Sequence, residues 1–216
     1  MKSSRQYKRP AFLTLVLVLF VPLGVGHAGQ AGKISLDKGV FLVAKPKISE
    51  GPFSESVVLL LMHGETGTLG VIVNRLTEVS LDDVLPDFER GSKETHRVFL
   101  GGPVALNGLL FVFRSARPLE GATHVMGDVY FSADLEVFEK VLKRKTSSSA
   151  LRLFLGHSGW GPGQLTWEIG RGDWELVRAD TETVFEKDPD MIWPELMGPV
   201  TRQVVEGRGV REYRTR

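Results

Sequence analysis

Two adjacent side chains, His157 and Ser158, have the types needed for a base and a nucleophile in hydrolysis. They lie in the glycine-rich segment 155–164, which we expect to follow a strand and precede a helix. A nucleophile elbow needs the pattern G-x-S-x-G, but Trp160 stands where its second glycine belongs. Adjacent side chains of an extended strand also point to opposite faces. We therefore predict a glycine-rich turn that holds Trp160 against the core, with a hydrolase using Ser158 and His157 as an alternative.

Other groups that could bind a metal or a cofactor are isolated in the sequence. A metal site needs two or three convergent ligands, and the histidines of the main body stand well apart: His63, His96, His124 and His157. The absence of cysteine excludes disulfides, thiolate metal sites and cysteine nucleophiles. Gly101 and Gly102 could cradle an anion, but no phosphate-loop pattern occurs and Pro103 lacks an N–H donor. The sequence therefore predicts no catalytic residue, no metal and no cofactor, hence not an enzyme.

The charge of the chain is unevenly distributed. The net charge of the 216 residues is +1, but the first 28 residues contain four basic and no acidic side chains. The remainder holds 23 basic and 26 acidic side chains, a charge of −3, which is poorly suited to binding a phosphate backbone. A basic cluster at residues 140–145 is explained by the C-terminus of a predicted helix, whose dipole it complements.

Residues 1–28 have the three parts of a secretory signal peptide. A basic start precedes an apolar run over residues 11–21, and Gly26 and Ala28 supply the small residues of a cleavage site. This run is shorter than the roughly 20 residues that a spanning helix needs. We therefore predict a periplasmic or secreted protein. The alternatives are an uncleaved leader that anchors the chain to a membrane, and a cytoplasmic protein whose start codon lies further downstream.

The elements that must position the candidate residues are short strands joined by glycine turns. Glycine makes up about 11% of the chain against a typical value of roughly 7%, which favours tight turns over long helices. Apolar runs predict strands at residues 40–44, 56–62, 69–74, 97–100, 109–113, 151–155 and 174–178, the second and third joined by a longer, glycine-bearing loop. Capping residues and helical spacing predict a short helix after Ser80 and further helices at residues 132–145 and 164–169. Asp188 and Pro189 open a further short segment that ends near Met197. Because strands and helices are mixed without regular alternation, we predict an α+β fold.

Five ordered blocks of the sequence resemble the YqgE/AlgH family over roughly residues 36–197. The matching residues are the segment 39–46; Phe53 with Ser56 and Val57; His63, Gly67, Gly70, Asn74 and Arg75; the segment 101–104; and Gly159, Trp160, Gly163, Gln164, Leu165, Glu168 and Ile169, followed by Trp174 and Trp193. Two features depart from the family pattern. Leu76 stands where a proline commonly follows the Asn-Arg pair, and the leader is unusual for a family expected in the cytosol.

The resemblance implies a single compact domain with a mixed, mostly antiparallel, barrel-like sheet flanked by a few helices. We place this domain at residues 39–197, after a linker at 29–38 and before a basic, loose tail at 198–216. The family is linked by name to transcriptional regulation, but no accepted reaction or cofactor comes with it. Export and DNA regulation are mutually exclusive, because an exported protein does not meet the chromosome.

These observations favour a non-catalytic binding or interaction domain whose partner is an unknown protein or small molecule. The candidate surface comprises His63, Asn74, Arg75, Gly101, Gly102, Trp160 and Gln164. Amide side chains supply directional hydrogen bonds and Arg75 could hold an anion, although Asn74 as a turn former and Trp160 as a core residue are competing interpretations. A cytosolic DNA-linked regulator is the alternative function. Membrane contact is expected only through an uncleaved leader.

Overall fold

The computed structural model describes residues 34–86, 96–144 and 148–198. The predicted leader, the first half of the linker and all of the basic tail after Gly198 lie outside these residues. The strands are β1 (Val40–Ala44), β2 (Val57–Gly64), β3 (Gly67–Ile72), β4 (Val98–Leu100), β5 (Val104–Arg114), β6 (Thr123–Met126), β7 (Val129–Ser132), β8 (Leu151–Trp160) and β9 (Trp174–Arg178). The α-helices are α1 (Leu81–Val84), α2 (Leu135–Lys143), α3 (Gln164–Gly170), α4 (Thr181–Phe185) and α5 (Pro189–Met197), and a short 3-10 helix spans Ser148–Ala150.

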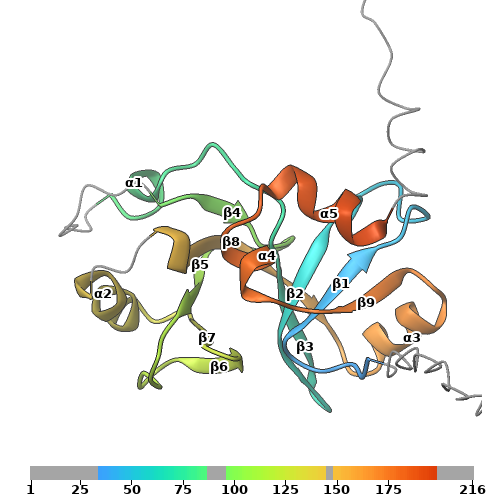
Figure 1. Ribbon diagram of the computed structural model, residues 1–216, viewed down its shortest axis with the longest axis horizontal. Coiled ribbons are helices and arrows are strands. Elements are labelled where there is room, and N and C mark those ends of the chain that lie inside the picture. Colours follow the sequence, from blue (N-terminus) through green and yellow to red (C-terminus); the bar gives the residue numbers. More distant parts are fainter. Residues whose placement is uncertain (1–33, 87–95, 145–147, 199–216) are drawn as a thin grey trace, which may run out of the picture. The chain divides into compact units, whose positions relative to one another are not determined.

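The strands form one mixed sheet in the order β6-β7-β5-β8-β3-β2-β1-β9, with β4 beside β8 (Figure 1). All its ladders are antiparallel except the parallel pair β4–β8. Strand β8 joins the two parts of the sheet, because its first residues pair with β4 and β5 and its last residues pair with β3. The predicted α+β, mostly antiparallel fold is therefore confirmed. Within the residues described, β6 and β9 remain the two ends of the strand order, so the sheet is open rather than closed into a barrel.

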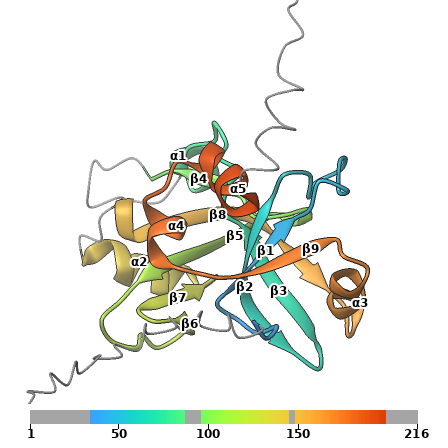
Figure 2. The same cartoon turned by 45° about the vertical axis from the view of Figure 1, so that its right-hand side comes forward.

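Three apolar cores cover this sheet, and β1 shows how two of them are separated. Phe41 and Val43 belong to a core that also holds residues of α4 and α5. Leu42 and Ala44 belong to a second core, beside α3. Because alternate side chains of a strand point to opposite faces, α5 and α3 cover opposite faces of β1 (Figure 2). A third core lies between β5, β7 and β8 and the apolar face of α2.

The β2–β3 hairpin is tighter than the sequence predicts. Gly64 pairs with Gly67, so only Glu65 and Thr66 form the turn, in place of the longer loop that we expected. Gly67 has a φ of 134°, and a Cβ atom there would lie 2.6 Å from the carbonyl oxygen of Trp160. The glycine is therefore required where the start of β3 lies directly beside the end of β8 in the sheet.

Strand β8 extends through most of the segment predicted as a glycine-rich turn, so that turn is wrong, whereas Trp160 does lie against a core as predicted. The strand continues to Trp160, and the turn that follows is confined to residues 161–163. Gly156 lies within the strand with a φ of 66°, opposite a register shift in β5 between Val104 and Leu109. Glycine inside a strand often marks such a bulge rather than the end of the strand.

The helix predicted at 132–145 begins later than expected, because Ser132 pairs with Phe111 as part of β7. Asp134 is the N-cap of α2, and its carboxylate accepts a hydrogen bond of 2.8 Å from the backbone N–H of Glu136. The short helix α1 has the capping box that the sequence predicts: Ser80 and Asp83 each bind the other's backbone N–H.

A candidate binding site beside α3

An open hollow of about 460 Å³ lies beside α3, between the ends of β8 and β9 and the β1–β2 loop (residues 45–56). We call it the aromatic hollow. It is lined by Lys47, Ile48, Phe53, Gly159, Trp160, Gln164, Glu168, Arg171, Asp173 and Trp174. These residues come from separate parts of the sequence, and the path β8–turn–α3–β9 brings most of them together.

Three aromatic rings form the apolar wall of the aromatic hollow. The ring of Phe53 stacks on Trp160 at a centroid distance of 5.8 Å and meets Trp174 edge-on at 5.6 Å. The two indoles meet edge-on at 6.0 Å. Both tryptophans are almost fully buried, with exposed fractions of 5% and 4%, so they belong to the core as well as to the wall. Each such aromatic pair contributes about 0.5–1.5 kcal/mol beyond the burial of its surface.

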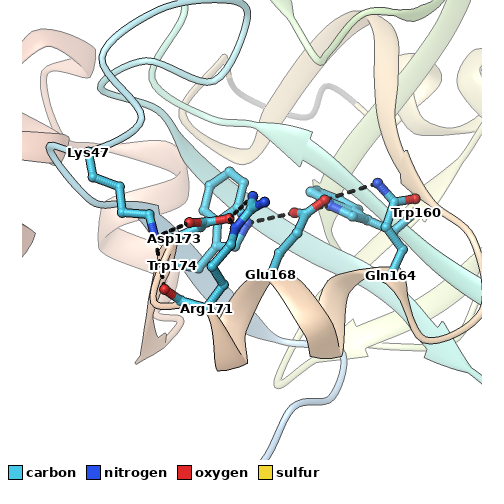
Figure 3. Close-up of polar contacts among 7 residues, drawn as sticks. All are labelled: Lys47, Trp160, Gln164, Glu168, Arg171, Asp173 and Trp174. Carbon is cyan, nitrogen blue, oxygen red and sulfur yellow. Dashed lines mark hydrogen bonds and ion pairs between the residues drawn. The ribbon is translucent and has the colours of Figure 1, made fainter.

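Glu168 is the central polar group of the aromatic hollow (Figure 3). Its Oε2 atom accepts hydrogen bonds from the indole Nε1 atoms of Trp160 and Trp174, each at 2.9 Å. Its Oε1 atom accepts a bond of 2.9 Å from the amide Nε2 of Gln164, one helical turn earlier on α3. The Oε1 atom of Gln164 in turn accepts the backbone N–H of Gly161 at 3.1 Å. The carboxylate is therefore held in one position by three donors.

Asp173 forms a second polar cluster in the same hollow, with one cation on each of its oxygens (Figure 3). Its Oδ1 lies 2.8 Å from the Nζ of Lys47, and its Oδ2 accepts hydrogen bonds from both the Nε and Nη2 atoms of Arg171. The bonds from Arg171, followed by that from Lys47, hold the pKa of Asp173 below its usual value although burial acts in the opposite direction. Lys47 also donates to the carbonyl oxygen of Arg171 at 2.8 Å, and thereby ties the β1–β2 loop to the end of α3.

The surface beside the aromatic hollow carries one exposed aromatic side chain. Trp167 on α3 is 61% exposed, and the guanidinium carbon of Arg171 lies 4.1 Å from its ring centroid. This is a cation–π contact, and it fixes the guanidinium between Trp167 and Asp173.

Trp160 and Gln164 are the two residues of the predicted surface that line the aromatic hollow. His63 lies further along the same sheet, at the β2–β3 hairpin. Its Nδ1 is 2.7 Å from the Oγ1 of Thr68, and Thr68 pairs with Trp160 in the neighbouring ladder. The structure thus places His63 two strands away from Trp160.

Asn74 and Arg75 line a different hollow, of about 420 Å³, between the β1–β2 loop and α5. Asn74 accepts the backbone N–H of Val57 at 2.8 Å and donates to the carbonyl oxygen of Glu55 at 2.9 Å. Arg75 donates to the carbonyl oxygens of Pro52 at 2.7 Å and Ser54 at 2.9 Å. Both side chains therefore hold the β1–β2 loop, whose other side supplies Phe53 and Lys47 to the aromatic hollow.

Gly101 and Gly102 lie against β8 and line neither hollow. A Cβ atom on Gly102 would be 2.4 Å from the backbone of His157. The two segments therefore approach so closely that only glycine, which has no Cβ, fits at this position. The hydroxyl of Ser158 is fully buried and donates to the carbonyl oxygen of Gly101 at 3.0 Å. The seven predicted residues thus divide between the aromatic hollow, the second hollow and two positions along the sheet.

Sequence reasoning missed the other residues of the aromatic hollow as site residues, among them Lys47, Phe53, Glu168, Arg171, Asp173 and Trp174. The spacing of Gln164 and Glu168 is a signal that could have identified Glu168, because residues four apart on a helix face each other. Lys47 and Phe53 are in a loop far away in the sequence, and nothing in the pattern indicates that they meet α3.

Two further observations concern the described residues as a whole. Across residues 34–86, 96–144 and 148–198, no group of three or more His, Cys, Asp or Glu side chains is arranged to hold a metal ion. Among the helices of the same ranges, none has the length and apolar character required to cross a membrane.

Comparison with known proteins gives consistent matches. A family model described as AlgH-like matches residues 41–204. A UPF0301 protein of Cytophaga hutchinsonii is 33% identical over 167 residues, covering 75% of this chain and 88% of the relative, and one of Streptomyces avermitilis is 36% identical over 171 residues, covering 76% and 87%.

Two solved structures share the fold. A crystal structure of a protein from Corynebacterium diphtheriae matches with a TM-score of 0.64 and 26% identity, covering 77% of this chain and 89% of that one. The solution structure of the AlgH protein from Pseudomonas aeruginosa matches with a TM-score of 0.61 and 22% identity, covering 83% and 93%. The second likeness concerns the fold alone.

Proposed function

This chain belongs to the AlgH-like family, as its sequence blocks predict, and from that premise we propose that it is a non-catalytic binding or interaction domain. The observation that carries the proposal is the aromatic hollow: an open depression of about 460 Å³ with an aromatic wall and a small set of polar groups. Binding sites typically combine an apolar lining with a few placed polar groups that orient the ligand.

The aromatic hollow is also preorganised, which supports the same proposal. Glu168, Gln164 and Asp173 are each held by hydrogen bonds before any ligand arrives. Side chains that are already fixed lose little conformational entropy on association, so more of the contact energy remains as affinity. The tie between Lys47 and Asp173 fixes the β1–β2 loop in the same way.

Site-specific photo-crosslinking in native cells tests this proposal. A photoreactive amino acid is placed at Gln164, which lines the aromatic hollow, and in a matched chain at Glu136, which is exposed on α2 away from it. We expect a discrete adduct, a protein or a small molecule identified by mass, at position 164 and not at position 136. The same adducts from both positions, or none from either, would count against a binding site here.

The partner identified in this way then allows a quantitative test with purified components. We expect Gln164→Ala to weaken its affinity roughly tenfold, about 1.4 kcal/mol, because the variant frees both Glu168 and the N–H of Gly161 from their present bonds. Glu136→Ala serves as the control and should leave the affinity unchanged. If Gln164→Ala binds the partner as tightly as the wild type does, the binding surface lies elsewhere on the protein.

We further propose that the domain acts outside the cytosol, on the basis of the signal-peptide pattern in residues 1–28. The intact mass of the protein from fractionated native cells tests this. A chain that begins near Gly29 in the periplasmic or secreted fraction is the expected result. A cytosolic chain that retains Met1, or starts near residues 33–39, would favour the DNA-linked regulator instead.

A further inference from the structure

We propose that the aromatic hollow receives a cationic group of its ligand, an ammonium or a guanidinium, and that Glu168 is the anion that binds it. This inference rests on the proposed binding function and specifies the class of ligand. It follows from which charged side chains around the hollow form ion pairs with each other and which do not.

Glu168 is held by neutral groups only. Its hydrogen bonds come from two indoles and one amide, and within the described parts of the chain it lies in no ion pair (Figure 3). Neutral N–H donors orient a carboxylate and stabilise it, but they leave its formal charge in place. A cation that enters the hollow therefore gains a charge-assisted contact with a carboxylate that is already positioned.

The two cations of the hollow are engaged by a different carboxylate. Lys47 and Arg171 both bind Asp173, and Arg171 also lies against the ring of Trp167. The charge of Glu168 contributes to the raised pKa of Arg171, but the principal cause is the hydrogen bond from Arg171 to Asp173. Among the residues that the structure describes, no cation thus forms a hydrogen bond with Glu168.

The other groups that line the hollow favour the same class of ligand. Phe53, Trp160 and Trp174 line the hollow together with Glu168, so the carboxylate lies against an apolar wall that strengthens its attraction for a cation. An anionic ligand would meet two carboxylates, and to pair with Lys47 or Arg171 it would have to compete with Asp173. A basic side chain or a small amine meets neither obstacle.

Nuclear magnetic resonance titration with tetramethylammonium chloride as the probe tests the inference on the wild-type chain. The indole ¹⁵N–¹H signals of Trp160 and Trp174 are direct reporters, because both groups donate to Glu168. Trp193 is an internal control, since its ring belongs to the core on the opposite face of β1 and its indole donates to the carbonyl oxygen of Ala44 at 2.7 Å. We expect saturable shifts of the first two signals and none of the third. Neutral tert-butanol and sodium acetate, at matched ionic strength, should produce shifts at least fivefold smaller.

Two variants locate the charge that matters. Glu168→Gln keeps an acceptor for the indoles but removes the charge, and we expect the apparent affinity for tetramethylammonium to fall at least tenfold. Glu175→Gln removes the same charge from an exposed residue that pairs with Lys45 outside the hollow, and should change the affinity less than twofold. Equal losses in both variants would overturn the role of Glu168.

The outcomes separate this inference from the proposed function. Shifts of Trp160 and Trp174 that are as large with tert-butanol or acetate as with tetramethylammonium would overturn the cationic class and leave a binding hollow in place. No shift with any of the three probes would overturn the cationic class, and photo-crosslinking at position 164 would then decide whether the hollow binds at all. The comparison among probes uses the wild-type chain, so it holds even if Glu168→Gln fails to fold.

Discussion

The carboxylate of Asp173 binds Lys47 of the β1–β2 loop and Arg171 at the end of α3. Protonation of Asp173 should therefore weaken the contact between these two segments. Its pKa in the folded protein is lowered, chiefly by the hydrogen bonds from Arg171. Over the pH range in which an unfolded Asp is becoming protonated, near 3.8, the folded carboxylate therefore stays ionised, and the unfolded state binds more protons. The stabilisation is fully present above the unfolded pKa and is lost as the pH falls through the folded pKa.

Urea unfolding between pH 2 and pH 7 tests this linkage with Asp173→Asn. We expect the variant to be less stable than the wild type by about 1–3 kcal/mol at neutral pH, because two donors lose a charged acceptor in a buried position. The difference should shrink as the pH falls below 4. Glu175→Gln, which breaks an exposed ion pair, should cost less than about 1 kcal/mol. A constant difference for Asp173→Asn at all pH values would contradict the assignment.

At the level of single residues, the sequence predicts the site only in part. Trp160 and Gln164 could be selected because they lie in one short, glycine-rich segment between a strand and a helix. Phe53 completes the same aromatic cluster from the β1–β2 loop. Its position depends on how Asn74 and Arg75 hold that loop, and this is a consequence of the whole fold rather than of a local pattern.

The β1–β2 loop is the element on which both hollows depend, and Asn74 is its main clamp. Asn74 bonds to the backbone of Val57 and Glu55, and Glu55 has a positive φ of 53°, a conformation that needs support in a residue other than glycine. We expect Asn74→Ala to destabilise the protein by about 1–3 kcal/mol, because a backbone N–H and a carbonyl lose their partners.

Hydrogen exchange identifies which segment responds to Asn74→Ala. The amides of residues 47–56 should exchange faster in the variant, whereas those of α2 should not change. Glu136→Ala, an exposed change on α2, is the control and should leave the loop unaffected. Uniformly faster exchange over the whole domain would mean that Asn74 stabilises the fold in general and does not specifically hold the loop.

The β2–β3 hairpin offers a second test, through two glycines at the ends of the same turn. A Cβ at Gly67 would lie 2.6 Å from the carbonyl oxygen of Trp160, whereas a Cβ at Gly64 would meet nothing within 4 Å. We expect Gly67→Ala to cost about 2 kcal/mol or more, because the positive φ and the close approach act together. Gly64→Ala should cost less than about 1 kcal/mol. Similar thermal midpoints for the two variants would show that β8 moves aside.

At the level of elements, the sequence identifies long apolar runs and fails where strands are short or interrupted. The β6–β7 hairpin was not predicted, because each strand has only four residues and β6 (Thr-His-Val-Met) is not a continuous apolar run. Its turn, Gly127 and Asp128, is a recognisable hairpin signal that could have found it. Strand β8 was predicted too short, because Gly156 serves a close approach to Gly102 within the sheet and does not end the strand.

At the level of the whole molecule, the class and family followed from the sequence, but the closure of the sheet did not. The mixture of elements and the ordered family blocks predict an α+β domain of the AlgH-like family, and both are confirmed. Whether a sheet closes depends on pairing between strands that are distant in the sequence. Here β6 and β9 are the ends of the order, and no local pattern indicates that these two strands stay unpaired with each other.

Among the described residues, those between Leu36 and Met197 build the three cores, and we expect them to suffice for the fold. We expect a protein that begins at Gly29 to unfold in one cooperative transition in urea, with a free energy within about 1 kcal/mol of that of the full-length chain. The comparison requires the full-length chain to be purified in the same buffer, and both transitions are followed by tryptophan fluorescence.

Equal stability of the two chains is what export with cleavage after Ala28 requires, because the mature protein must be stable without the residues that directed it. A truncated chain that is unfolded, or several kcal/mol less stable, would mean that the leader is part of the folded domain. The signal-peptide interpretation, and the location outside the cytosol that follows from it, would then be wrong.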